Sequence, residues 1–212
     1  MRHFVEFRTM TLNWEFMLPA VLLLWLPLPG APVEGLRRKD APPNVTGLLR
    51  AWQNWVDLLR SFAGVYLLTM LAFGSAPASR GDTGALMGIR AVILCLGMLM
   101  QMIRFNDGFA LYAPIFYATG LALMTPGYVL GAFAAFFGWA LACGLKDFRL
   151  LLPVMALALG VSSYFWEGVN RPLLIICGLI ALPFLLAMLL QRPLLFTQRP
   201  KPVLRDDVSR IA

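Results

Sequence analysis

Apolar residues gather in six long runs along this chain, with short polar connections between them. The runs cover residues 46–73, 84–103, 108–125, 127–145, 150–166 and 172–190. About 20 apolar helical residues cross the roughly 30 Å hydrocarbon layer of a membrane. Lipid admits only helices and closed barrels, and barrel strands alternate apolar and polar residues, which these runs do not. The pattern therefore predicts an all-α fold, a polytopic transmembrane helical bundle with six spans.

The composition agrees with a lipid environment for much of the chain. Of 212 residues, 59% are hydrophobic and 14% are charged, which is more apolar material than one soluble core of this size encloses. Cys95, Cys143 and Cys177 lie inside or near apolar runs. We therefore expect free thiols that pack as small hydrophobic groups, and no disulfide framework.

Basic residues fall mostly on alternate connections, which predicts the orientation of the bundle. One side receives Arg37, Arg38, Lys39, Arg50, Arg104, Lys146, Arg149 and the basic residues after the sixth run. The opposite side receives only Arg80, Arg90 and Arg171. Because cytoplasmic connections carry an excess of Lys and Arg, we expect the C-terminus in the cytosol and the first of the six spans running outward. The expected location is the membrane, specifically a bacterial inner (plasma) membrane.

The N-terminal segment is apolar over residues 16–28, but it is short for a span and contains Pro19 and Pro27. Arg2 and Arg8 favour an interfacial or re-entrant segment with the N-terminus in the cytosol. The alternatives are a seventh span with an outside N-terminus and a signal peptide. The expected organisation is a membrane-associated segment and basic cytosolic loop over 1–45, a six-helix transmembrane domain over 46–190, and a basic, Pro-containing cytosolic tail over 191–212.

Four charged residues lie in or beside the first two runs. Asp57 carries a charge that needs a partner inside a membrane, and Arg60 and Arg104 are the expected partners. We favour an ion pair near the headgroups because these charges lie toward a helix end; the alternative is a polar path that gates a substrate, ion or proton. For Arg90 we expect a side chain that reaches outward to the headgroups, with a pore or ligand role as the alternative.

Small residues recur at four-residue spacing in the fourth and fifth runs, which lets helix backbones approach closely. The expected packing seam comprises Gly131, Ala135, Gly138, Ala142, Ala156 and Gly160. Packing within one copy of the chain is the favoured use of this seam. Self-association, or docking to another membrane subunit, is the alternative.

The residues that identify a reaction are scarce. His3 is the only histidine, and there is no Cys-x-x-Cys pair, nucleophile elbow or glycine-rich phosphate loop. We therefore expect no catalytic residues, no metal site, no cofactor and no enzyme activity. The formal charge of +7 is spread over the connections, which argues against nucleic acid as a partner.

Three functions remain for a chain of this kind. The favoured one is a structural or assembly subunit of a membrane complex, with the lipid bilayer, membrane protein partners or further copies of itself as contacts. The alternative is a transporter or channel for a small solute or ion that uses Asp57, Arg60, Arg90 and Arg104. An enzyme acting on lipids is a third, weaker possibility. The basic tail is expected to contact anionic lipid, or else to dock a partner.

Overall fold

The computed structural model describes residues 13–26, 49–72, 80–105, 109–124, 128–167, 171–192 and 194–195. Within these residues the chain is all-α apart from three short strands, as the sequence predicts. The helices are α2 (Trp14–Trp25), α4 (Trp52–Tyr66), α5 (Arg80–Met102), α6 (Ile115–Met124), α7 (Tyr128–Leu145), α8 (Leu151–Glu167) and α9 (Arg171–Leu189). A π-helical segment, η1 (Leu67–Ala72), continues α4, and a 3₁₀ turn, η2 (Phe148–Leu150), leads into α8.

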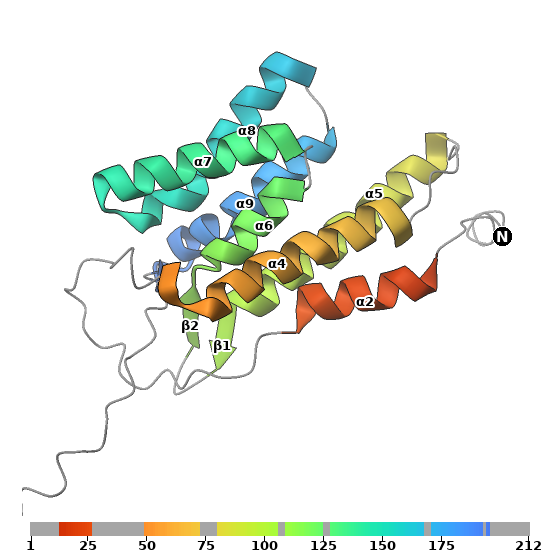
Figure 1. Cartoon of the computed structure of the whole chain (residues 1–212), viewed down its shortest axis with the longest axis horizontal. Helices are drawn as coiled ribbons and strands as arrows, with labels where there is room; N and C mark the ends of the chain where they lie inside the picture. The colour runs from red at the N-terminus through yellow and green to blue at the C-terminus, as the bar shows by residue number, and fades with distance from the viewer. Residues whose placement is uncertain are drawn as a thin grey trace, which may run out of the picture.

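Helix α6 is the centre of the bundle. It packs against α4 on one side and against α7 on the other, with further contacts to α8 and α9 (Figure 1). All residues from Ile115 to Ala122 are buried, so no face of this helix is left for solvent or lipid. Helices α2, α4 and α5 form one group beside it, and α7, α8 and α9 form the other.

A small sheet closes one end of the bundle. It consists of β1 (Ile103–Phe105), β2 (Phe109–Tyr112) and β3 (Leu194–Leu195), in that order. Strand β1 pairs with β2 in antiparallel fashion, and β3 pairs with β2 in parallel fashion, with Leu111 opposite Leu194. The end of α9 therefore lies at the same end of the bundle as the β1–β2 hairpin.

The prediction of one continuous helix over residues 108–125 is wrong. Its first part is strand β2, and the helix that follows, α6, has only ten residues. Pro114 explains the break, because a proline has no N–H to donate and disfavours helical backbone in the residue before it. The Pro114 carbonyl instead accepts the first helical bond of α6 from the Ala118 N–H at 2.8 Å.

The prediction of six spans is only partly matched. Among the described residues, two helical segments are long and apolar enough to cross a membrane, Tyr128–Leu145 with 18 residues and Phe148–Trp166 with 19. The other apolar helical stretches are shorter: Trp14–Trp25, Leu86–Met102, Ile115–Met124 and Leu174–Leu189. Two such helices indicate a membrane protein weakly, by length and composition only.

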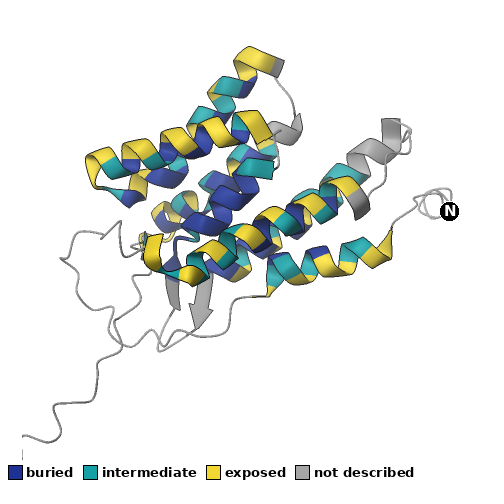
Figure 2. Cartoon of the chain, in the orientation of Figure 1, coloured by how far each residue is buried: buried dark blue, intermediate teal, exposed yellow. Residues whose placement is uncertain are grey.

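The outer surface of the bundle is rich in large apolar side chains, and every helix except the central α6 has exposed bands (Figure 2). Helix α4 is the clearest case. Its polar and small residues Arg60, Ser61 and Gly64 face the interior, while Trp52 and Leu59 are 64% and 62% exposed. A helix on the surface of a water-soluble protein has the reverse arrangement, with its apolar stripe toward the core.

Candidate functional site

The C-terminal end of α2 lies inside the bundle, and side chains from two other helices bind its carbonyl groups. The Tyr117 hydroxyl of α6 donates to the Leu24 carbonyl oxygen at 3.0 Å. The Gln101 amide of α5 donates to the same oxygen at 3.4 Å and to the Trp25 carbonyl at 3.5 Å. The last carbonyls of a helix have no partner within the helix, so these side chains satisfy groups that would otherwise be buried without hydrogen bonds.

Two glycines make room for this helix end. A β-carbon on Gly64 of α4 would lie 2.8 Å from Cγ of Leu24, and one on Gly97 of α5 would lie 2.6 Å from the Tyr117 hydroxyl. Trp25 adds a further anchor, because its indole N–H donates to the Ile93 carbonyl of α5 at 3.0 Å. Close approach of α2 therefore depends on residues from three helices.

An ion pair lies next to this helix end. The Arg60 Nε atom is 3.0 Å from Oδ1 of Asp57, one turn earlier in α4. Arg60 is only 8% exposed and Asp57 is 28% exposed, so the arginine is buried between helices while the carboxylate is partly accessible. The Arg60 guanidinium carbon lies 5.7 Å from the centre of the Tyr117 ring, a cation–π distance. Its Nη2 atom is buried and has no hydrogen-bond partner in the described part of the chain.

The structure does not bring Arg90 to this place. Its Nη2 atom donates to the Thr69 carbonyl in η1 at 3.3 Å. Thr69 is nine residues after Arg60 along the same helix, which corresponds to about 14 Å of helix length. The side chain of Arg104, whose backbone belongs to β1, lies outside the described residues. Of the four residues predicted to form an ion pair or polar path, the structure therefore brings together Asp57 and Arg60. It places Arg90 farther along the bundle, beside η1.

A second polar contact joins α6 to α7. The Trp139 indole N–H donates to the Thr119 hydroxyl at 3.1 Å, and the Thr119 hydroxyl donates to the Ile115 carbonyl. The Trp139 ring packs edge-on against Phe116 and Phe148. Nothing in the spacing of the sequence singled out Trp139 or Thr119, because each is one polar atom within a continuously apolar run.

The predicted small-residue seam is divided over three helix contacts. Gly138 faces α8, where a β-carbon on it would meet the Met155 side chain at 3.1 Å and the Leu151 carbonyl at 3.2 Å, and Ala142, one turn later in α7, is buried. Gly131 instead lies against the Ala122 backbone of α6. The remaining members are Ala135 and Ala156, both buried, and Gly160, whose neighbour is Cys177 of α9. Close packing thus links α6, α7, α8 and α9 into one unit.

In the described ranges, no group of three or more His, Cys, Asp or Glu side chains is placed to hold a metal ion. The three cysteines are free thiols. No protein-family model, curated protein or solved structure matches this chain. The function therefore has to be argued from the arrangement of side chains alone.

Proposed function

We propose that this protein is an integral membrane protein that serves, without catalysis, as a structural or assembly subunit of a membrane complex. The observation that carries the proposal is the reversed polarity of α4, with the buried Arg60 and Ser61 side chains inside and tryptophan and leucine outside. Water would make such a helix face unfavourable, since each exposed apolar side chain forfeits about 1.5–3 kcal/mol of burial free energy. Lipid removes that cost.

The interior supports a structural role. Four polar side chains donate hydrogen bonds to neighbouring helices, namely those of Tyr117, Gln101, Trp25 and Trp139, and the Trp139 bond is accepted by the Thr119 hydroxyl. Their hydrogen-bonding capacity is thus used to join helices, which is how polar groups stabilise bundles where lipid gives no hydrophobic driving force between helices. We further propose a cytosolic C-terminus, a bacterial inner membrane and six crossings, on the alternation of basic residues along the sequence. In the third crossing, strand β2 and the short helix α6 replace one continuous helix.

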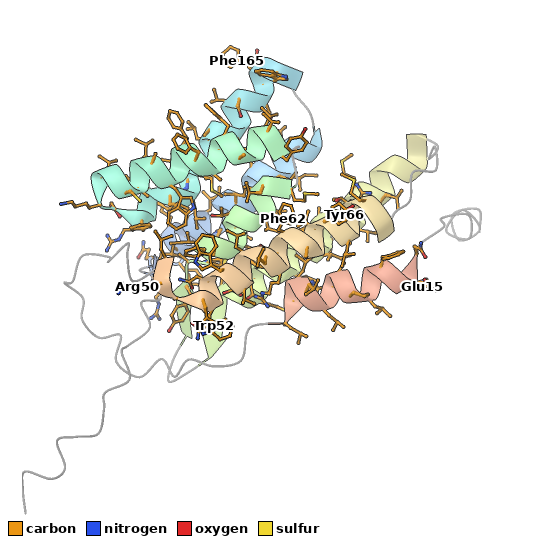
Figure 3. All side chains as sticks on the ribbon, in the orientation of Figure 1. Glu15, Arg50, Trp52, Phe62, Tyr66 and Phe165 are labelled. Atoms are coloured by element: carbon orange, nitrogen blue, oxygen red, sulfur yellow. The ribbon has the colours of Figure 1, made fainter. Side chains whose placement is uncertain are left out.

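The outer surface also offers candidate contacts for partner subunits. Aromatic side chains of α7 and α8 point outward, among them Phe136 at 71% exposed, and Figure 3 shows Phe165 at the far end of α8 away from the rest of the bundle. Apolar helix faces of this kind serve equally for lipid and for a neighbouring membrane helix, so only a binding experiment separates the two.

Purification in mild detergent tests the proposal. The tagged chain is solubilised from membranes, and all co-purifying proteins are identified by mass spectrometry, with a chain lacking residues 196–212 as the matched control, which keeps strand β3. A fixed set of partners that survives a second purification step is expected. Recovery of the chain alone, in a single-copy particle, would contradict a subunit role. Loss of partners only in the truncated chain would assign their docking to the basic tail.

A transporter or channel is the second candidate, and the unpaired Nη2 atom of Arg60 beside the partly accessible Asp57 is the observation that favours it. Buried ionisable residues within membrane bundles often line substrate or ion paths. The test is flux of small ions or solutes into proteoliposomes that contain the purified chain, with Asp57→Asn as the variant. Flux that the substitution abolishes would favour transport, whereas no flux with the unchanged chain would remove this candidate.

A further inference from the structure

We infer that α2 is an inserted half-length helix, held in a seat formed by Gly64, Gly97, Gln101 and Tyr117, and that it enters the bundle from the membrane face opposite to the β1–β2 hairpin. The seat is a property of the fold itself. The assignment of α2 to a membrane face rests, in addition, on the proposed function. From the sequence we expect an interfacial or re-entrant segment with a cytosolic N-terminus, whereas α2 in this arrangement begins on the outer side.

The direction of α2 is fixed by its contacts. Its last turn, at Leu24 and Trp25, lies against Gly64, near the end of α4, and against Ile93 and Gly97 in the second half of α5, and α2 also packs along η1, which continues α4. Figure 3 shows Glu15, at the start of α2, and Arg50, before the start of α4, at opposite ends of this pair of helices. Helix α2 is therefore antiparallel to α4, as Figure 1 also shows.

The end of α9 and the start of α2 lie at opposite ends of the bundle. Strand β3 follows α9 directly and pairs with β2, so the end of α9 lies at the hairpin end of the bundle. The start of α2 lies at the other end. Across a membrane, the two ends of the described chain would then face different compartments.

The length of α2 explains why its last turn needs a seat. Its 12 residues span about 18 Å, against a hydrocarbon layer of roughly 30 Å. The helix therefore ends part-way across, where no water is present to bind its last carbonyls. Tyr117 and Gln101 supply the missing donors. The last turn of α2 holds no basic residue of its own, and the Arg60 guanidinium on the Tyr117 ring supplies a positive charge near this negative helix end.

The charge pattern agrees with this topology. Arg37, Arg38 and Lys39 lie in the sequence between α2 and α4. Helix α4, which follows these basic residues in the sequence, begins at the hairpin end of the bundle (Figure 1), so the excess of Lys and Arg in cytoplasmic connections favours a cytosolic hairpin end and an outside start of α2. A helix that crosses only partly also accounts for a run too short to be a full span.

A cysteine pair tests the seat, whether or not the protein is in a membrane. In a chain with Cys95, Cys143 and Cys177 replaced by Ala, Leu24→Cys is combined with Gly64→Cys, and a protease site is inserted within residues 27–48. After oxidation and cleavage, the two fragments should remain joined on a non-reducing gel. The matched control combines Leu22→Cys, Leu24→Ala and Gly64→Cys, since Leu22 is exposed on the other face of α2. Equal joining in both chains, or joining in neither, would overturn the seat.

Labelling with a membrane-impermeant maleimide tests the topology. In the same cysteine-free chain, Asn13→Cys and Gln191→Cys are introduced one at a time. Both residues are exposed, and they lie at opposite ends of the described bundle. Asn13→Cys should react in intact cells, and Gln191→Cys should react only after the membrane is permeabilised. Reaction of both from the same side would overturn the orientation of α2. Recovery of the chain in the soluble fraction would contradict the proposed function instead, and would leave the cysteine-pair result on the seat standing.

Discussion

Arg60 brings a positive charge into a bundle of mostly apolar helices, and its neighbours account for its position. Asp57 neutralises it at 3.0 Å, and the Tyr117 ring covers the guanidinium. Removing each charge from water costs roughly several kcal/mol of desolvation free energy. The attraction between the two charges offsets much of that desolvation cost. The pair is thus sensitive to the loss of one member and tolerant of the loss of both.

Replacement of Asp57 tests this asymmetry. Removal of one partner from a buried ion pair costs about 3–5 kcal/mol, and for the partly exposed Asp57 we expect Asp57→Asn to lower the free energy of unfolding by about 2 kcal/mol. The double variant Asp57→Leu with Arg60→Met should recover most of this loss, because no unpaired charge remains. Denaturant-induced unfolding in mixed micelles measures both. A double variant less stable than Asp57→Asn would contradict the explanation.

Tyr117 allows a one-atom test of the α2 seat. Tyr117→Phe removes the hydroxyl that donates to the Leu24 carbonyl, and we expect a loss of about 1 kcal/mol in stability, the usual net value of one hydrogen bond. Protease cleavage between α2 and α4 should then release α2 more readily. Tyr128→Phe is the control, since Tyr128 is exposed on α7 and should leave both measurements unchanged.

The sequence could single out the ion pair but not its setting. Asp57 and Arg60 are conspicuous as charges within an apolar run, and their spacing of three residues places them on one helix face. Tyr117 and Leu24 carry no comparable signal, because their contact depends on where α2 ends relative to α6. Such long-range contacts are set by the packing of the whole bundle.

Helices α4 and α6 cross at a point where both backbones are nearly in contact. A β-carbon on Gly120 of α6 would coincide with the Ser61 hydroxyl oxygen and lie 2.5 Å from the Leu58 carbonyl oxygen. Small residues are needed at such crossings because a side chain would force the backbones apart. Since α6 is buried on all faces, it has no space into which to move.

Gly120→Ala should therefore be strongly destabilising. Overpacking typically costs 1–3 kcal/mol, and because the obstacle here is backbone, we expect about 3 kcal/mol. Gly178→Ala is the matched control on α9, where nothing lies within 4 Å of an added β-carbon. That change should be neutral or stabilise the protein by about 0.5–1 kcal/mol through helix propensity. Thermal unfolding in detergent compares the two, and equal stability of both variants would contradict a tight α4–α6 crossing.

The apolar runs were enough to predict that most of the chain is helical. The residues at which each helix begins and ends depended on individual turn residues and prolines. The sequence indicates the helices α7 and α9 within a residue or two of their observed bounds, because turn residues flank both runs. The prediction of a helix over the third run was wrong for its first part, residues 108–112. Ala110, Leu111 and Tyr112 are as apolar as a buried helix requires, but they pair with β1 and β3 as strand β2. Hydrophobicity alone does not separate a short buried strand from a buried helix.

The chemical character of the bundle's outer surface indicates whether water or lipid surrounds it. Large apolar side chains are exposed on α2, α4, α5, α7, α8 and α9, while the polar side chains of Arg60, Gln101 and Ser163 are buried. A soluble protein exposes contiguous apolar patches of only a few hundred Å². Under the proposed function, lipid would cover these exposed side chains, on several helices besides the two that are long and apolar enough to cross a membrane.

A charge placed on this surface distinguishes lipid from water. Phe136 lies near the middle of α7, 71% exposed, and Leu145 is the last residue of the same helix and also exposed. In lipid, an arginine at the centre of a span costs about 2.5–3.5 kcal/mol on insertion scales, whereas one at the end reaches the headgroups at little cost. Phe136→Arg should thus reduce the share of protein that stays in membranes after alkaline extraction, and Leu145→Arg should not. In water, both changes would raise solubility equally, so equal behaviour of the two variants would refute a lipid-facing α7.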